Sequence, residues 1–210
     1  ITNPDYYYVC GSAVSSFPFP KIVQFAQSVI GREIREQSME QEGRLPDMIC
    51  GCVGGGSNFI GSIHEFLDEP NIKKIGVEAA ETAALTHGTP NIMQGMKSYM
   101  LASSDGSKSL GGSSLGAGIQ YFGVGPQHSY LKDQGAVTYT SATDKEILNA
   151  YKVVAQTEGI SSALEPMAAA AEVLKQAKGK PKDFIIVLSL CGRGEKDLDT
   201  IEEHMGKDFE

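Results

Sequence analysis

Apolar and polar residues alternate with two different periods along this 210-residue chain. Short, nearly continuous apolar runs are typical of buried strands, whereas apolar residues that recur every three or four positions are typical of helices with one buried face. The strand candidates are residues 48–53, 74–78, 137–141 and 184–190. The helix candidates are residues 22–42, 59–67, 143–157 and 165–177.

Because strand and helix candidates follow one another in turn, the pattern predicts an α/β fold: a doubly wound, mostly parallel sheet with helices on both faces. The run at 184–190 favours a central position in this sheet, since a strand covered on both sides is apolar almost throughout. The string Thr143-Asp-Lys-Glu146 is a capping box, which predicts a helix start. Residues 93–125 are rich in glycine and serine and predict long loops.

Composition narrows the class of protein. The net charge is −8 and no basic stripe is present, so nucleic acid is not an expected partner. No apolar run approaches the roughly 20 residues of a membrane span, and the first residues lack the features of a secretory signal. The four cysteines lie in apolar segments, which favours reduced thiols and a cytoplasmic location.

The first candidate site is the glycine-rich turn between the strand at 48–53 and the helix at 59–67. It comprises Gly54, Gly55, Gly56, Ser57 and Asn58. Glycines let the backbone approach a ligand closely, and the free N–H groups at a helix start favour a phosphate. The turn fits neither the dinucleotide fingerprint nor the nucleoside-triphosphate loop. A turn that only packs the helix on the strand is the alternative.

A second glycine-rich exit, residues 191–194, follows the last strand candidate. The carboxyl ends of parallel strands meet at one edge of a sheet, so we expect both exits to border one ligand. Glu78 lies 22 residues after Gly56 at the end of a strand. This position suits an acid that binds a ribose, which keeps NAD as a less favoured ligand.

Seven strings spread along the chain carry a resemblance to a known family. They are residues 43–47, 52–58, 75–78, 95–97, 124–131, 158–160 with 163–165, and 191–197. In this order they resemble the β subunits of tryptophan synthase. The resemblance implies the large domain of a fold-type II pyridoxal-phosphate enzyme, which condenses indole with L-serine to give L-tryptophan and water.

The resemblance also implies roles for individual residues. The turn at 54–58 matches the loop that binds the phosphate of pyridoxal 5'-phosphate, and Gly11 and Ser12 match a loop bordering this cofactor. Cys191, followed by Gly192, stands where the family has a serine facing the pyridine nitrogen, and Glu165 matches an acid near the ring. The carbonyl groups expected to hold a monovalent cation, Na⁺ or K⁺, are those of Gly54, Tyr121 and Gly123.

The chain departs from the family in extent and at one acidic position. It matches only the carboxyl-terminal half, with residues 1–26 as a remnant of the amino-terminal domain and 27–210 as the cofactor-binding domain. Residues Tyr6 to Val14 are then expected to form a strand that has lost the neighbouring strands with which it would pair. Gln120 replaces an acid that closes the site over the substrate. The lysine that holds the cofactor covalently has no counterpart, so no catalytic residue is assigned.

We therefore expect this chain to be inactive alone. Its expected partners are the amino-terminal half, the tryptophan synthase α subunit and a second β subunit. The alternative is a non-catalytic domain that binds a phosphate or nucleotide, or that serves in assembly.

Overall fold

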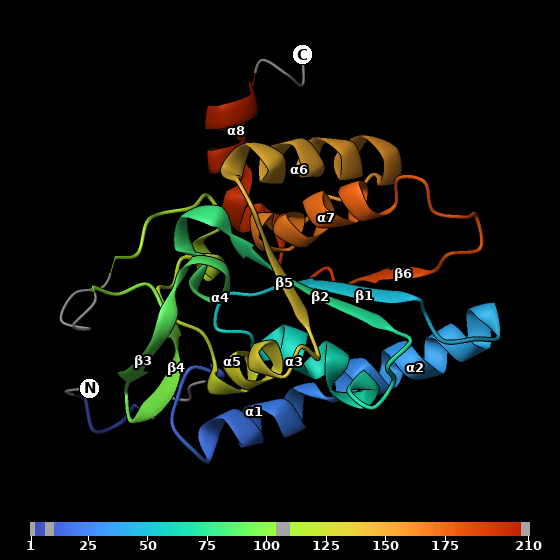
Figure 1. The fold of residues 1–210 in the computed structure, drawn as a ribbon. Coiled ribbons are helices and arrows are strands. Elements are labelled where there is room, and N and C mark those ends of the chain that lie inside the picture. The colour runs from blue at the N-terminus through green and yellow to red at the C-terminus, as the bar shows by residue number, and fades with distance from the viewer. Residues whose placement is uncertain (1–2, 7–10, 104–109, 207–210) are drawn as a thin grey trace.

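The fold is built on a four-stranded parallel sheet, seen in a computed structural model that describes residues 3–6, 11–103 and 110–206 (Figure 1). The strand order is β5-β2-β1-β6, and each neighbouring pair is parallel. The strands are β1 (Met48–Cys52), β2 (Lys73–Ala79), β5 (Thr138–Ala142) and β6 (Ile186–Leu188). The first three lie within two residues of the ranges expected from the sequence.

Helices cover both faces of this sheet (Figure 1). On one face lie α6 (Asp144–Glu158), α7 (Leu164–Gln176) and α8 (Leu198–Met205). On the other lie α1 (Phe19–Gln27), α2 (Val29–Glu42), α3 (Ser57–Ile63) and α5 (Pro126–Asp133). The prediction of an α/β fold with a parallel sheet between two helical layers is confirmed.

Alternate residues of β1 supply the two cores. Cys50 faces the helical layer of α7, where it packs in one cluster with Met167 and neighbouring alanines. Ile49 points the other way and packs in a second cluster with Phe59 and other residues of α3. Successive side chains of a strand point to opposite faces, so one five-residue strand anchors both layers and holds the start of α3 at its end.

Two elements differ from the sequence prediction because local chemistry interrupts them. Residues 22–42 form two helices rather than one, and the break falls at Ser28, whose hydroxyl donates to the carbonyl of Phe25 at 2.8 Å. A serine that bonds to the backbone inside a helix bends it. The expected helix at 59–67 starts earlier, at Ser57, and ends in a 3₁₀ turn, His64–Phe66.

The prediction of a central strand at residues 184–190 is wrong within this chain. Only residues 186–188 form β6, and this strand lies at the edge of the sheet, paired with β1. Its three residues are half-buried. Apolarity alone did not distinguish an edge strand from a central one.

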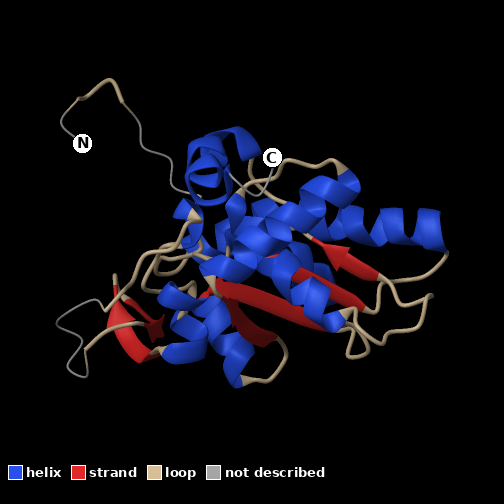
Figure 2. Ribbon diagram, turned by 90° about the horizontal axis from the view of Figure 1, so that it is seen from above, coloured by secondary structure: helices blue, strands red, loops and turns tan. Residues whose placement is uncertain are grey.

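A β-hairpin was missed: its first strand lies in a region for which no element was predicted, and its second lies in the segment expected to form loops. β3 (Thr89–Met93) and β4 (Met96–Met100) are antiparallel and joined by Gln94 and Gly95. Both turn residues have positive φ, 49° and 75°, as a two-residue hairpin turn of the primed type requires. Figure 2 shows the hairpin set apart from the main sheet.

The expected unpartnered strand at 6–14 falls partly on residues 7–10, which lie outside the described residues. Residues 11–14 are neither helix nor strand. A short helix, α4 (Ala84–His87), follows β2 and completes the elements around the site. In the described part of the chain no helix is both long and apolar enough to cross a membrane.

Candidate functional site

The glycine turn leaves a row of backbone donors unused. It joins the end of β1 to the start of α3, and Gly56 has φ 95°, in the left-handed region. The backbone N–H groups of Gly55, Gly56, Ser57 and Asn58 donate to no other residue that the structure describes. Unused N–H groups at a helix start carry partial positive charge and bind anions.

Two other loops press against this turn. A Cβ atom at Gly54 would lie 2.4 Å from the carbonyl oxygen of Gly118, and one at Gly55 would lie 2.9 Å from the hydroxyl of Ser12. Only glycine fits against the backbone at position 54, whereas the side chain of Ser12 can shift to admit a methyl group at position 55. The three loops enclose a cavity of about 440 Å³. Its lining residues are Ser12, Val14, Gly55, Gln94, Ala117, Gly118, Gln120 and Tyr121.

His128 packs against the glycine turn and forms a hydrogen bond with it. It was not among the site residues predicted from the sequence. The Nε2 atom of this buried ring lies 2.7 Å from the carbonyl oxygen of Gly56, and Nδ1 lies 2.8 Å from the hydroxyl of Tyr139. A carbonyl only accepts, so Nε2 carries the proton and Nδ1 accepts from Tyr139. Burial lowers the pKa of His128 to about 4, which keeps the ring neutral.

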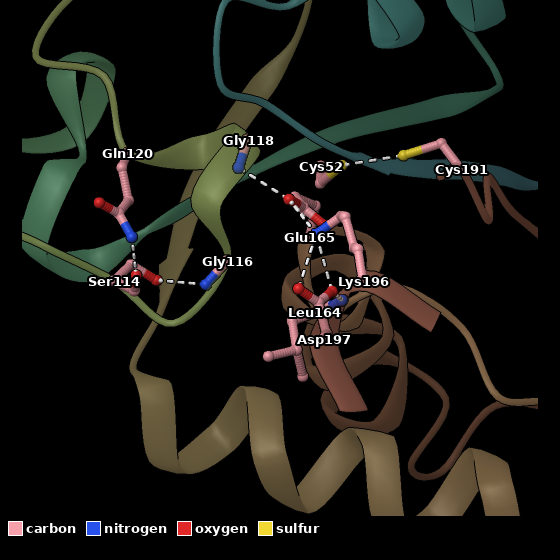
Figure 3. Close-up of polar contacts among 10 residues, drawn as sticks. All are labelled: Cys52, Ser114, Gly116, Gly118, Gln120, Leu164, Glu165, Cys191, Lys196 and Asp197. Atoms are coloured by element: carbon pink, nitrogen blue, oxygen red, sulfur yellow. Dashed lines mark hydrogen bonds and ion pairs between the residues drawn. The ribbon is translucent and has the colours of Figure 1, made fainter. Parts of the chain in front are cut away.

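Glu165 lies beside Gly118 in the loop at 116–120 (Figure 3). Its carboxylate is held in the ionised form. Its Oε1 accepts from the backbone N–H of Gly118 at 2.7 Å and from Lys196 at 2.9 Å. Burial opposes ionisation, but the hydrogen bonds from Lys196 and Gly118 outweigh it, and the pKa of Glu165 is lowered. The other oxygen, Oε2, is buried without a partner among the described residues.

Lys196 is an amine close to the site that sequence reasoning did not single out. Its Nζ also lies 2.8 Å from both carboxylate oxygens of Asp197, which in turn accepts from the N–H of Leu164 at the start of α7 (Figure 3). Burial lowers the pKa of Lys196, but the carboxylates of Asp197 and Glu165 outweigh this effect and raise it. The amine is therefore a protonated partner of Glu165 rather than a nucleophile.

Cys191 meets the end of β1, as expected for two strand exits at one edge. Its Sγ lies 3.5 Å from Sγ of Cys52 (Figure 3), which also accepts from the side-chain amide of Asn58 at 3.7 Å. The hydrogen bond with Cys52 lowers the pKa of Cys191, while the same bond and burial raise that of Cys52. Either thiol can donate in this contact, and these two shifts favour Cys52 as the donor and Cys191 as the thiol that ionises first. Gly192 follows with φ 74°.

Three further residues were proposed from the sequence: Tyr121, Gly123 and Gly11. Tyr121 lines the cavity, but a Cβ at Gly123 would meet Met93 and Met100 of the hairpin rather than Gly54. Gly11 is exposed. Among the described residues no group of three or more His, Cys, Asp or Glu side chains is arranged to hold a metal ion.

Glu78 does not suit the ribose-binding role considered for NAD. Its side chain is buried and its two oxygens accept from the N–H groups of Leu85 and Thr86 in α4, at 2.8 and 3.0 Å. Gln120, in contrast, lies at the cavity and donates to the carbonyl of Ser114.

The geometry suits pyridoxal phosphate: free amides for a phosphate, a thiol at a strand end and an anchored carboxylate. Residues 2–192 match the protein family described as pyridoxal-phosphate dependent enzyme. Over 215 residues the chain is 47% identical to the tryptophan synthase beta chain of Allorhizobium ampelinum, a match that covers 98% of this chain and 53% of that relative. The chain thus spans about half the length of the relative it matches.

A solved structure agrees on the fold. A crystal structure of an O-ureido-L-serine-bound mutant of O-ureido-L-serine synthase superposes with a TM-score of 0.59 and covers 86% of this chain and 51% of that one. At 17% identity this likeness concerns the fold alone. With the family match spanning nearly the whole sequence, the chain belongs to the pyridoxal-phosphate-dependent enzymes.

Proposed function

We propose that this chain is the cofactor-binding half of a tryptophan synthase β subunit, which replaces the hydroxyl of L-serine with indole. The row of free amides in the glycine turn, of which Gly55 lines the 440 Å³ cavity, is the observation that carries the proposal. A cavity of this size is in the range of cofactor sites. Bound pyridoxal phosphate would supply the aldehyde and the electron-withdrawing ring that β-replacement needs.

Each of the residues described around the glycine turn has a distinct role in this proposal. The amides at residues 55–58 hold the phosphate, and Cys191, a weak and uncharged donor when protonated, faces the ring nitrogen. Glu165 stays ionised beside the ring because Gly118 and Lys196 hold its charge. Gln120 faces the substrate side, where it offers a neutral amide rather than an acid.

The proposal leaves covalent chemistry to a second polypeptide segment. No lysine is among the residues that line the cavity, and Lys196 is ion-paired. The amino-terminal half is the proposed source of the lysine, and this chain alone is expected to make no tryptophan. A second β subunit, the tryptophan synthase α subunit, a Na⁺ or K⁺ ion and a cytoplasmic location are further parts of the proposal, supported by the resemblance.

Replacing Gly55 tests the phosphate site directly. Gly55→Ala adds only a methyl group near Ser12, whereas Gly55→Asp adds a charge that repels phosphate. We expect the Asp variant to bind pyridoxal phosphate at least about tenfold more weakly than the Ala variant, a difference of about 1.4 kcal/mol or more. Titration of each variant with pyridoxal phosphate, followed by the fluorescence of the cofactor, measures both affinities.

Pyridoxal, which lacks the phosphate, is the control ligand. Its affinity should differ little between the two variants. An equal loss for both ligands would contradict the phosphate assignment. Addition of the amino-terminal half of a related β subunit should give tryptophan from indole and serine, and failure with cofactor bound would favour a non-catalytic binding domain.

A further inference from the structure

Cys52 and Cys191 are arranged for a covalent bond. Cys52 ends β1, and Cys191 follows β6, the parallel neighbour in which Leu188 lies opposite Cys50. A disulfide has an S–S distance of about 2.0 Å. The two sulfur atoms are already 3.5 Å apart. A bond between them therefore needs only a small movement of the side chains.

The two thiols differ in access and in charge. Cys191 is half-buried and opens toward solvent, whereas Cys52 is 3% exposed. The hydrogen bond with Cys52 lowers the pKa of Cys191 and so favours its thiolate. The thiolate is the form that attacks an oxidant. Cys191 is thus the thiol that reacts first.

We propose that Cys52 and Cys191 are a modification site, a thiol pair that hydroperoxides convert into a reversible disulfide. In the first step the Cys191 thiolate attacks hydrogen peroxide, forms a sulfenic acid and releases hydroxide. In the second, sulfur of Cys52 attacks sulfur of Cys191, the S–O bond breaks, and the released hydroxide takes the Cys52 proton as water. The hydroxide released in the first step takes up the proton that Cys191 lost on ionisation, so one peroxide becomes two waters while two thiols are oxidised to one disulfide.

Formation of the sulfenic acid also prepares Cys52 for its step. The first cause of the raised Cys52 pKa is its hydrogen bond to Cys191. Once Cys191 carries a neutral sulfenic acid, the negative charge that held the Cys52 proton is gone. We therefore expect the second step to outrun further oxidation of Cys191.

The same strand contains a control thiol. Cys50 lies two residues before Cys52 on the same face, but it is fully buried and its Sγ contacts the carbonyl of Ala169 at 3.6 Å. Burial raises the pKa of Cys50 to about 12. It should stay reduced under conditions that oxidise the pair.

The test uses the full chain with Cys10→Ser, which leaves three thiols. Treatment with hydrogen peroxide should lower the intact mass by two hydrogen atoms, and thiol titration should find one thiol instead of three. Peptide mapping should link residue 52 to residue 191, and dithiothreitol should restore both. Cys50→Ser should still form the bond, whereas Cys52→Ser should accumulate sulfinic or sulfonic acid at Cys191.

A Cys191 that is overoxidised while Cys52 is present, or a bond that includes Cys50, would overturn the proposal. Its consequence for the cofactor rests on the proposed function: a disulfide removes the thiol from the ring nitrogen, so oxidised chain should bind pyridoxal phosphate more weakly. If the disulfide forms and cofactor affinity stays unchanged, the assignment of Cys191 to the ring nitrogen fails while the modification site stands.

Discussion

Glu78 and His128 are buried ionisable side chains whose titrations oppose each other over nearly the same pH range. Burial raises the pKa of Glu78 to about 7, despite hydrogen bonds from Leu85 and Thr86. Burial lowers the pKa of His128 to about 4. Both groups are therefore neutral in the folded protein near pH 5.5, where both are charged in the unfolded chain.

The sign of each effect follows from which state holds the proton. Between its folded pKa near 4 and its ordinary value of 6.5, His128 is protonated only when unfolded, so the free energy of unfolding rises with pH. Between 4.5 and its folded pKa near 7, Glu78 is protonated only when folded, so the free energy of unfolding falls with pH. Each slope is about 1.4 kcal/mol per pH unit.

In the overlap, from 4.5 to 6.5, the two slopes cancel, and we expect the stability of the unmodified chain to be nearly flat. Glu78→Gln should expose the rising slope of His128, and its stability should increase by about 3 kcal/mol across the overlap. His128→Gln should expose the falling slope of Glu78 and lose a similar amount. Any cost of the amide side chains themselves is a constant offset.

Urea unfolding followed by circular dichroism at several pH values in this window gives the free energies, since the chain has no tryptophan for fluorescence. Asp47, Glu146 and Glu165 have lowered pKa values and lose their contributions below the window. Subtracting the unmodified chain from each variant removes what remains. Parallel pH profiles for the three proteins would refute the assignment of these two groups.

Two further substitutions test local structure. Thr143→Ala removes the capping box formed with Glu146 at the start of α6 and should lower the free energy of unfolding by about 1 kcal/mol in urea melts, whereas an unchanged midpoint would contradict a stabilising cap. Lys196→Met removes the ammonium from Glu165 and should raise the pKa of this carboxyl in an NMR titration with ¹³C-labelled glutamate. A Glu165 pKa that stays where it was would mean that Gly118 alone holds its charge.

The main sheet could be predicted because its signal is local. The buried strand β1 is a continuous apolar run, β2 has a short apolar centre between charged residues, and a glycine-rich turn after β1 is visible in the sequence. The hairpin was hidden because each strand has only five residues, one holds Pro90, and several side chains are exposed. The signal that could have found it is the pair Gln94 and Gly95 between two short alternating runs.

The contacts that hold the site residues in place could not be predicted from local sequence patterns. His128 and Tyr139 lie 11 residues apart, and neither has a motif that announces a contact with the glycine turn. The turn to α5 and the pairing of β5 with β2 bring them together. Lys196 reaches Glu165 only because the chain after β6 folds back over the start of α7. Such contacts depend on tertiary packing, which period and composition do not encode.

The division of labour within the site follows from where its groups come from. The phosphate donors and Cys191 lie where β1 and β6 end, so this chain positions them by itself. Its amine beside Glu165, that of Lys196, is neutralised by two carboxylates, and freeing it would leave Glu165 and Asp197 without their cation. An amine able to attack an aldehyde must be uncharged. The same ion pairs that keep Glu165 ready for a cofactor ring therefore exclude Lys196 from covalent chemistry, which is why the proposed enzyme needs a lysine from elsewhere.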